Sequence, residues 1–123
     1  MTIEIVWIRD DASLAAQCAV WRKQPFVALD TEFMRVDTFY PIAGLLQVSE
    51  GECAYLIDPL LIGDWSPFAA LLEDPQVVKV LHACSEDLEV FLRLTGSLPA
   101  PLFDSQLGAV FEYPGILFGR QSV

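Results

Sequence analysis

The chain has 123 residues, which fits one domain of ordinary size, and no second full domain is expected. Hydrophobic residues make up 54% of it, which favours either a sheet buried on both faces or a surface that something outside this chain covers. The formal net charge of -10 argues against general binding to a polyanion. A metal-dependent phosphodiesterase is the main exception, because cations held by an acidic site meet the phosphate.

The first predicted elements are a strand and a helix. Residues 3–8 are mostly apolar and predict a strand. Asp10 or Asp11 can cap a helix that extends to about Lys23, and Pro25 separates that helix from the next element.

Three strands are predicted next, joined as an antiparallel meander. Residues 26–32 are apolar and partly β-branched, as in a central strand. After an irregular stretch at 35–41, residues 45–49 and 54–57 predict two strands of a hairpin with Gly51 in its turn.

A helix and a parallel strand follow. Residues 66–72 predict a helix with Pro67 at its favourable first position, and residues 77–81 predict a strand. Because a helix precedes this strand, it is expected to lie parallel to its neighbour. The fold class is therefore α/β, with a mixed sheet.

The last elements begin with a helix that starts at Ser85, where the hydrophobic period changes. Residues 102–103 predict a short extended piece. Asp104 or Ser105 can then cap a final helix that extends to Phe111.

Membrane and disulfide classes are not favoured. No apolar run approaches the roughly 20 residues of a membrane span, and the N-terminus has no signal-peptide pattern, so a cytoplasmic protein is expected. Cys18, Cys53 and Cys84 are odd in number and form no CxxC pair, which indicates reduced, partly buried thiols.

Acidic residues follow two of the predicted strands. Side chains at i and i+2 of a strand share a face, so Asp30 and Glu32 are expected to lie together. Asp87 lies in the first turn of a helix that follows another strand, and can approach Asp30 if the two strands are neighbours. Three carboxylates would then hold divalent metal ions, with Asp30 as the bridging candidate.

Four segments carry a resemblance to a known family. They are Leu29-Asp-Thr-Glu-Phe33, Gly44-Leu-Leu-Gln47, Leu81-His-Ala-Cys-Ser-Glu-Asp87-Leu-Glu-Val-Phe91 and Leu102-Phe-Asp-Ser-Gln106. Together they resemble bacterial ribonuclease D, a DEDD-superfamily 3′-5′ exonuclease with a ribonuclease H-like fold. The resemblance covers the N-terminus to about Phe111.

The resemblance implies roles for these residues. Asp30 and Glu32 match the motif that binds the catalytic metal, and Asp87 matches the aspartate that supports a second ion directly or through water. Two divalent ions, Mg²⁺ or Mn²⁺, are implied as cofactors. The implied partner is the 3′ end of structured RNA such as transfer-RNA precursors, released one mononucleotide at a time.

The chain also departs from that family. The third family motif, a tyrosine and an aspartate four residues later, is expected beyond Val123, and Tyr113 is followed four residues on by Leu117. The C-terminal modules that aid RNA binding in the family are expected to be absent, and residues 112–123 diverge from the family. We therefore expect a single truncated exonuclease domain over residues 1–123, with weak metal binding and impaired activity.

Several alternatives stay open. Phe33 and Gln47 can contact a nucleotide or only pack in strands, and His82 is expected to be structural. Two other functions also remain open for the chain. One is a catalytically inactive interaction or nucleic-acid-binding module, and the other is a DNA-directed proofreading exonuclease. The C-terminal helices that cover part of one sheet face in the family are expected to be missing from this chain. An apolar face would then be left uncovered, which predicts a homo-oligomer.

Overall fold

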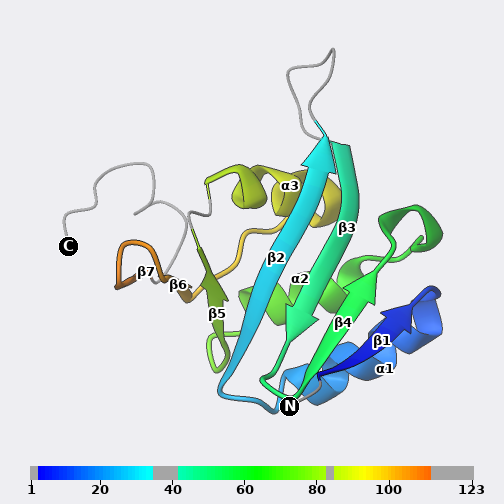
Figure 1. The fold of residues 1–123 in the computed structure, drawn as a ribbon, viewed down its shortest axis with the longest axis horizontal. Coiled ribbons are helices and arrows are strands. Elements are labelled where there is room, and N and C mark those ends of the chain that lie inside the picture. The colour runs from blue at the N-terminus through cyan, green and yellow to red at the C-terminus, as the bar shows by residue number, and fades with distance from the viewer. Residues whose placement is uncertain (1–2, 35–41, 83–84, 112–123) are drawn as a thin grey trace.

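The computed structural model describes residues 3–34, 42–82 and 85–111. Within them a seven-stranded mixed sheet has the order β1-β4-β3-β2-β5-β6-β7 (Figure 1). The strands are β1 (Glu4–Ile8), β2 (Phe26–Met34), β3 (Ile42–Ser49), β4 (Cys53–Ile57), β5 (Val78–Leu81), β6 (Leu102–Asp104) and β7 (Ala109–Phe111). The helices are α1 (Asp11–Trp21), the 3-10 helix η1 (Pro59–Leu61), α2 (Ser66–Glu73) and α3 (Ser85–Thr95). The predicted α/β class with a mixed sheet is confirmed.

The central meander forms as predicted. β3 pairs antiparallel with both β2 and β4, and the β3–β4 turn contains Gly51 at φ 113°, a conformation that side chains disfavour. β1 lies at one edge of the sheet, parallel to β4.

The other half of the sheet is parallel. β5 pairs parallel with β2 on one side and with β6 on the other, which confirms the orientation predicted for residues 77–81. Since the carboxyl ends of parallel strands meet at one edge, the ends of β2, β5 and β6 lie at the same edge of the sheet.

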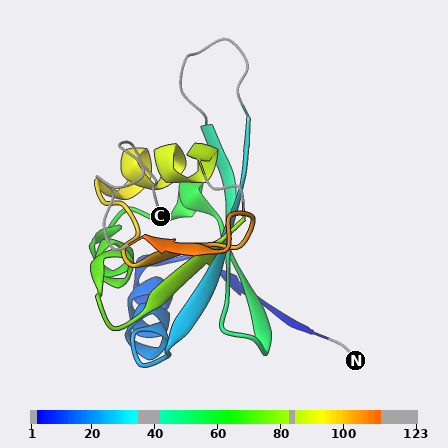
Figure 2. The ribbon, with the colours of Figure 1, turned by 90° about the vertical axis from the view of Figure 1, so that its left-hand side faces the viewer.

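The helices α1, α2 and α3 lie on one side of the sheet (Figure 2). β2 shows the consequence in its alternation: Leu29 and Thr31 are buried toward the helices, whereas Asp30 and Glu32 are exposed on the other face. Below, the face of the sheet away from the helices is called the open face.

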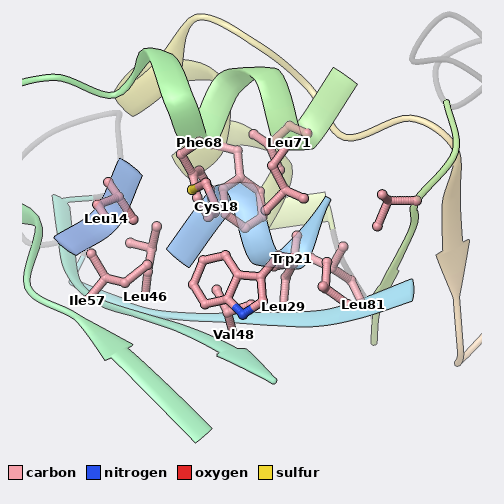
Figure 3. Packing of buried hydrophobic residues seen from close by; sticks show 14 of the residues in the cluster. Leu14, Cys18, Trp21, Leu29, Leu46, Val48, Ile57, Phe68, Leu71 and Leu81 are labelled. Carbon is pink, nitrogen blue, oxygen red and sulfur yellow. The ribbon is translucent and has the colours of Figure 1, made fainter. Parts of the chain in front are cut away.

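The core fills the space between the sheet and the helices (Figure 3). α1 begins after Asp10, whose carboxylate accepts the Ser13 N–H at 2.7 Å, and it buries Leu14, Cys18 and Trp21. Trp21 is fully buried and meets Tyr55 of β4 edge-on, with ring centroids 5.2 Å apart. Packing of these side chains against the sheet thus holds α1, α2 and α3 in one layer.

The final helix predicted after Asp104 is wrong. Residues 105–108 form a single turn, closed by the Gly108 N–H bonding to the Asp104 carbonyl at 2.7 Å, and β7 then pairs antiparallel with β6. Asp104 does cap the turn, accepting the Gln106 N–H at 2.9 Å. Gly108, at φ 68°, turns the chain back, because β6 offers an unpaired edge that β7 can complete.

The structure also bears on the predictions about the cysteines and about membrane spans. Cys18 is buried and Cys53 is partly exposed, both as free thiols. The irregular stretch at 35–41, Cys84 and the tail at 112–123 lie outside the described residues. Across the described ranges, every helix is too short or too polar for a membrane span.

Candidate active site

β2 presents two carboxylates on the open face. Asp30 and Glu32 are both exposed, and they lie across from Gln47 and Leu45 of β3. The prediction that the pair shares a face is confirmed. The β2–β3 register shifts just after Glu32, so the pair lies where regular pairing is interrupted, which is a common position for a functional side chain.

α3 supplies the third carboxylate from the helix side. Asp87 lies in its first turn and is only 8% exposed. Burial raises the pKa of Asp87, the hydroxyl of Thr31 opposes this, and the negative charges of Asp30 and Glu86 raise it further. Asp87 is therefore close enough to Asp30 to feel its charge, as the parallel placement of β2 and β5 predicts.

Thr31 connects these two carboxylates. Its backbone N–H donates to Asp30 Oδ1 at 2.9 Å, and its hydroxyl donates to Asp87 Oδ1. Sequence reasoning did not single out Thr31. The signal was present, because a residue between two that face outward on a strand must face the helices.

The donor chemistry fits a hard divalent cation. Carboxylate oxygens are the ligands that Mg²⁺ and Mn²⁺ prefer, and the repulsion that Asp30 exerts on Asp87 is of the kind that a cation relieves. In the part of the chain that the structure describes, no three His, Cys, Asp or Glu side chains are already placed so that they could hold a metal ion. The residues thus fit as ligands from two sides, although the predicted three-carboxylate cluster is not preformed.

The two residues predicted to contact the nucleotide are Gln47 and Phe33. Gln47 is exposed directly opposite Asp30, so it borders the same surface. The side chain of Phe33 is not among those that the structure describes.

His82 follows β5 and bonds to a neighbouring strand end. Its Nδ1 lies 3.0 Å from Ser105 Oγ, and that hydroxyl lies 3.2 Å from the carbonyl of Leu81. Because a serine has one hydroxyl proton, donation to Leu81 leaves Oγ to accept from Nδ1–H. His82 thereby links the ends of β5 and β6, in keeping with the structural role expected of it.

Comparison with known proteins assigns the chain to a family. Residues 5–114 match the family described as 3′-5′ exonuclease. The chain belongs to the 3′-5′ exonuclease family. Asp30, Glu32 and Asp87 all lie inside the matched residues.

Within this family the chain is similar to ribonuclease D. It is 77% identical over 108 residues to ribonuclease D of Pseudomonas paraeruginosa, covering 88% of this chain and 29% of that protein. The expected resemblance to ribonuclease D is thereby confirmed. The chain spans less than a third of that relative's length.

Solved structures agree with the fold. The crystal structure of Escherichia coli RNase D, described as an exoribonuclease involved in structured RNA processing, matches with a TM-score of 0.79 and 51% identity, over 87% of this chain and 28% of that one. Trypanosoma brucei RNase D in complex with RNA U12 shares the fold, with a TM-score of 0.73 and 20% identity, over 85% of this chain and 38% of that one.

Proposed function

We propose that this chain carries part of the catalytic site of a metal-dependent 3′-5′ exoribonuclease of the ribonuclease D type, acting on 3′ ends of structured RNA such as transfer-RNA precursors in the cytoplasm. The observation that carries the proposal is the pairing of Asp30 and Glu32 on the open face with Asp87 behind them, in a chain of the 3′-5′ exonuclease family. Hydrolysis of the terminal phosphodiester bond is the reaction.

The proposed roles follow from where each side chain lies. Asp30 and Glu32, exposed on one face, would hold Mg²⁺ or Mn²⁺ where a phosphate can reach it from solvent. Asp87, buried and tied to Thr31, would support the ions from the helix side. Bound divalent cations supply activation of a water molecule and electrostatic stabilisation of the phosphate. Gln47, opposite Asp30, is placed to contact the nucleotide.

The test is release of labelled mononucleotide from a 3′-labelled structured RNA with Mg²⁺ or Mn²⁺. We expect slow metal-dependent release by the chain alone, which Asp30→Asn reduces by at least about 100-fold, because the variant loses a charged ligand of the ion. Asp58→Asn is the matched control. It makes the same change at the cap of η1, where Asp58 Oδ1 accepts the Leu60 N–H, and asparagine caps equally well.

Two other functions are decided by the same assay. No release even when the remaining part of a ribonuclease D is appended, together with metal-independent RNA binding, would favour a catalytically inactive interaction module. Faster release from DNA than from RNA of the same sequence would favour a proofreading-type exonuclease.

We further propose that residues 1–111 are the first part of the exonuclease domain and that the site needs an additional carboxylate from elsewhere. The open geometry of the three acids supports this. A fusion that appends the remaining part of Pseudomonas paraeruginosa ribonuclease D should release mononucleotide much faster than the chain alone. Equal rates would contradict the proposal.

Self-association is the last part of the proposal. β1 places Ile5 and Trp7 on the open face with 60% and 46% of their surfaces exposed, and Ile3, just before the strand, is 59% exposed. An apolar stripe along an edge strand favours contact with a second copy. We propose a homo-oligomer formed through this stripe.

A further inference from the structure

We propose that Thr31 is a positioning residue that sets where Asp87 lies relative to Asp30. The inference rests on the proposed metal-dependent function and names a residue outside the acidic set. Thr31 is 8% exposed and lies between the two outward-facing acids of β2. It is hydrogen-bonded to two of the three carboxylates at once.

The two carboxylates that accept these bonds lie on opposite sides of the strand. The backbone N–H donates to Asp30 Oδ1, which turns that carboxylate along the strand on the open face. The hydroxyl belongs to a buried side chain and donates to Asp87 Oδ1 on α3, which lies in the layer of helices. One residue therefore couples the orientation of ligands that are 57 positions apart in the chain, 30 to 87.

Apolar packing alone cannot supply this alignment. Leu88 and Phe91 bury one face of α3 and so fix the height of the helix over the sheet. They do not determine which way the Asp87 carboxylate turns. A hydrogen bond to a charged acceptor in a buried position does so, and is stronger than a bond between neutral groups.

Threonine also suits the position by its shape. Its β-branch restricts rotation about χ1, which limits the directions open to the hydroxyl of this buried side chain. Valine has nearly the same shape without the hydroxyl, and serine keeps the hydroxyl without the methyl. These two substitutions separate the hydrogen bond from the packing.

The experiment measures Mn²⁺ binding to the whole chain by electron paramagnetic resonance of free Mn²⁺, without RNA. Thr31→Val is expected to weaken Mn²⁺ binding about tenfold, which is the lower end of what loss of a hydrogen bond to a metal ligand costs. Thr31→Ser should restore affinity to within about threefold of wild type. A result in which Thr31→Val binds Mn²⁺ as tightly as wild type overturns the proposal.

Thr95→Val is the matched control for stability. The Thr95 hydroxyl lies at the other end of α3 and donates to the Phe91 carbonyl at 2.8 Å. Its loss should lower the free energy of unfolding without changing Mn²⁺ affinity. If Thr95→Val weakens Mn²⁺ binding as much as Thr31→Val does, general loosening of α3 explains both effects and the proposal is wrong.

A double-mutant cycle tests whether Thr31 acts through Asp87. In the Asp87→Asn background, Thr31→Val should cause no further loss of Mn²⁺ affinity, whereas additive losses would contradict the proposed route. Should Thr31→Val fail to fold, the wild-type protein still decides: Mg²⁺ is expected to shift the NMR resonances of Thr31 and not those of Thr95. Shifts at Asp30 and Glu32 with none at Thr31 would overturn the proposal.

Asp30→Asn separates this inference from the function on which it rests. If Asp30→Asn binds Mn²⁺ as tightly as wild type, the metal site itself is wrong, and the role of Thr31 falls with it. If Asp30→Asn weakens binding and Thr31→Val does not, only the role of Thr31 is wrong.

Discussion

Lys79 shows how a single buried charge is accommodated in this molecule. It lies on β5 with no exposed surface, and its ammonium donates to the carbonyls of Asp74 at 2.6 Å and Ala100 at 3.1 Å. Asp74 ends α2, and Ala100 precedes β6, so the side chain joins a helix terminus to the segment that leads into the next strand. Lys79 is thus a structural cross-link.

The ionisation of Lys79 should make stability depend on pH. Burial lowers the pKa of Lys79 to about 8, from 10.5, although the charge of Asp74 partly opposes this. Between about pH 8 and 10.5 the unfolded chain binds the proton that the folded chain has released, so this residue adds stability as the pH rises. Relative to Lys79→Met, the wild type should gain up to about 3 kcal/mol across that window in urea unfolding.

The comparison with Lys79→Met is needed because other groups act in the opposite sense. Burial raises the pKa of Cys18 to about 12 and that of Tyr55 as well, so above about pH 9 the folded state retains protons that the unfolded chain loses. Both proteins share this loss of stability, and the difference between them isolates Lys79. A difference that does not change with pH would show that the lysine remains charged in the fold.

At the scale of elements, the turn between β6 and β7 holds together the end of the sheet formed by β5, β6 and β7. The Ser105 N–H donates to the Leu81 carbonyl at 2.7 Å, so the turn is attached to the end of β5 as well as to β6. Ser105 also contacts His82, so two bonds hold the turn at the carboxyl end of β5. The turn therefore stabilises the edge of the sheet at which the candidate site lies.

Gly108→Ala should destabilise the protein by about 1 kcal/mol. Gly108 has φ 68°, and no atom lies within 4 Å of an added Cβ, so the cost is backbone strain and not a clash. Gly44→Ala is the control, since its Cβ would make an ordinary contact 3.6 Å from the Glu32 carbonyl and its φ is not in the left-handed region. Thermal unfolding of both variants measures the effect, and equal shifts would contradict the assigned strain.

At the scale of the whole molecule, the helices cover one face of the sheet, and none of the helices in the described residues covers the other face (Figure 2). The open face has two unlike regions. The apolar stripe of Ile3, Ile5 and Trp7 lies at the β1 edge, and the Arg9 guanidinium covers the Trp7 ring at 4.8 Å. Asp30, Glu32 and Gln47 lie on the central strands. Association at the edge is thus compatible with access to the acids.

Trp7→Ser should shift the proposed oligomer toward monomer. The loss of a large apolar side chain from the stripe weakens association by roughly tenfold or more in dissociation constant, because an interfacial tryptophan commonly contributes over 1.4 kcal/mol. Light scattering coupled to size exclusion at micromolar concentration measures the mass. Leu60→Ser, at a residue 87% exposed on η1, is the control. A monomeric wild type would refute the self-association proposal.

Local geometry explains which parts of this fold could be predicted. The shared face of Asp30 and Glu32 follows from the two-residue period of any strand, and the start of α1 follows from a carboxylate that caps its own helix. The parallel placement of β5 follows from the helix that precedes it. By contrast, residues 104–111 carry a helix-capping signal that is realised for only one turn.

The sequence by itself determined that the chain is α/β, that two acids share a face of a central strand, and that its family is that of the 3′-5′ exonucleases. These features depend on short-range periodicity and on motifs contiguous in the chain. The tertiary structure alone decided that β7 pairs with β6 and that the Thr31 hydroxyl meets Asp87. The reason is physical: both depend on which groups distant segments bring together, and hydrogen bonds across that separation leave no periodic trace in the sequence.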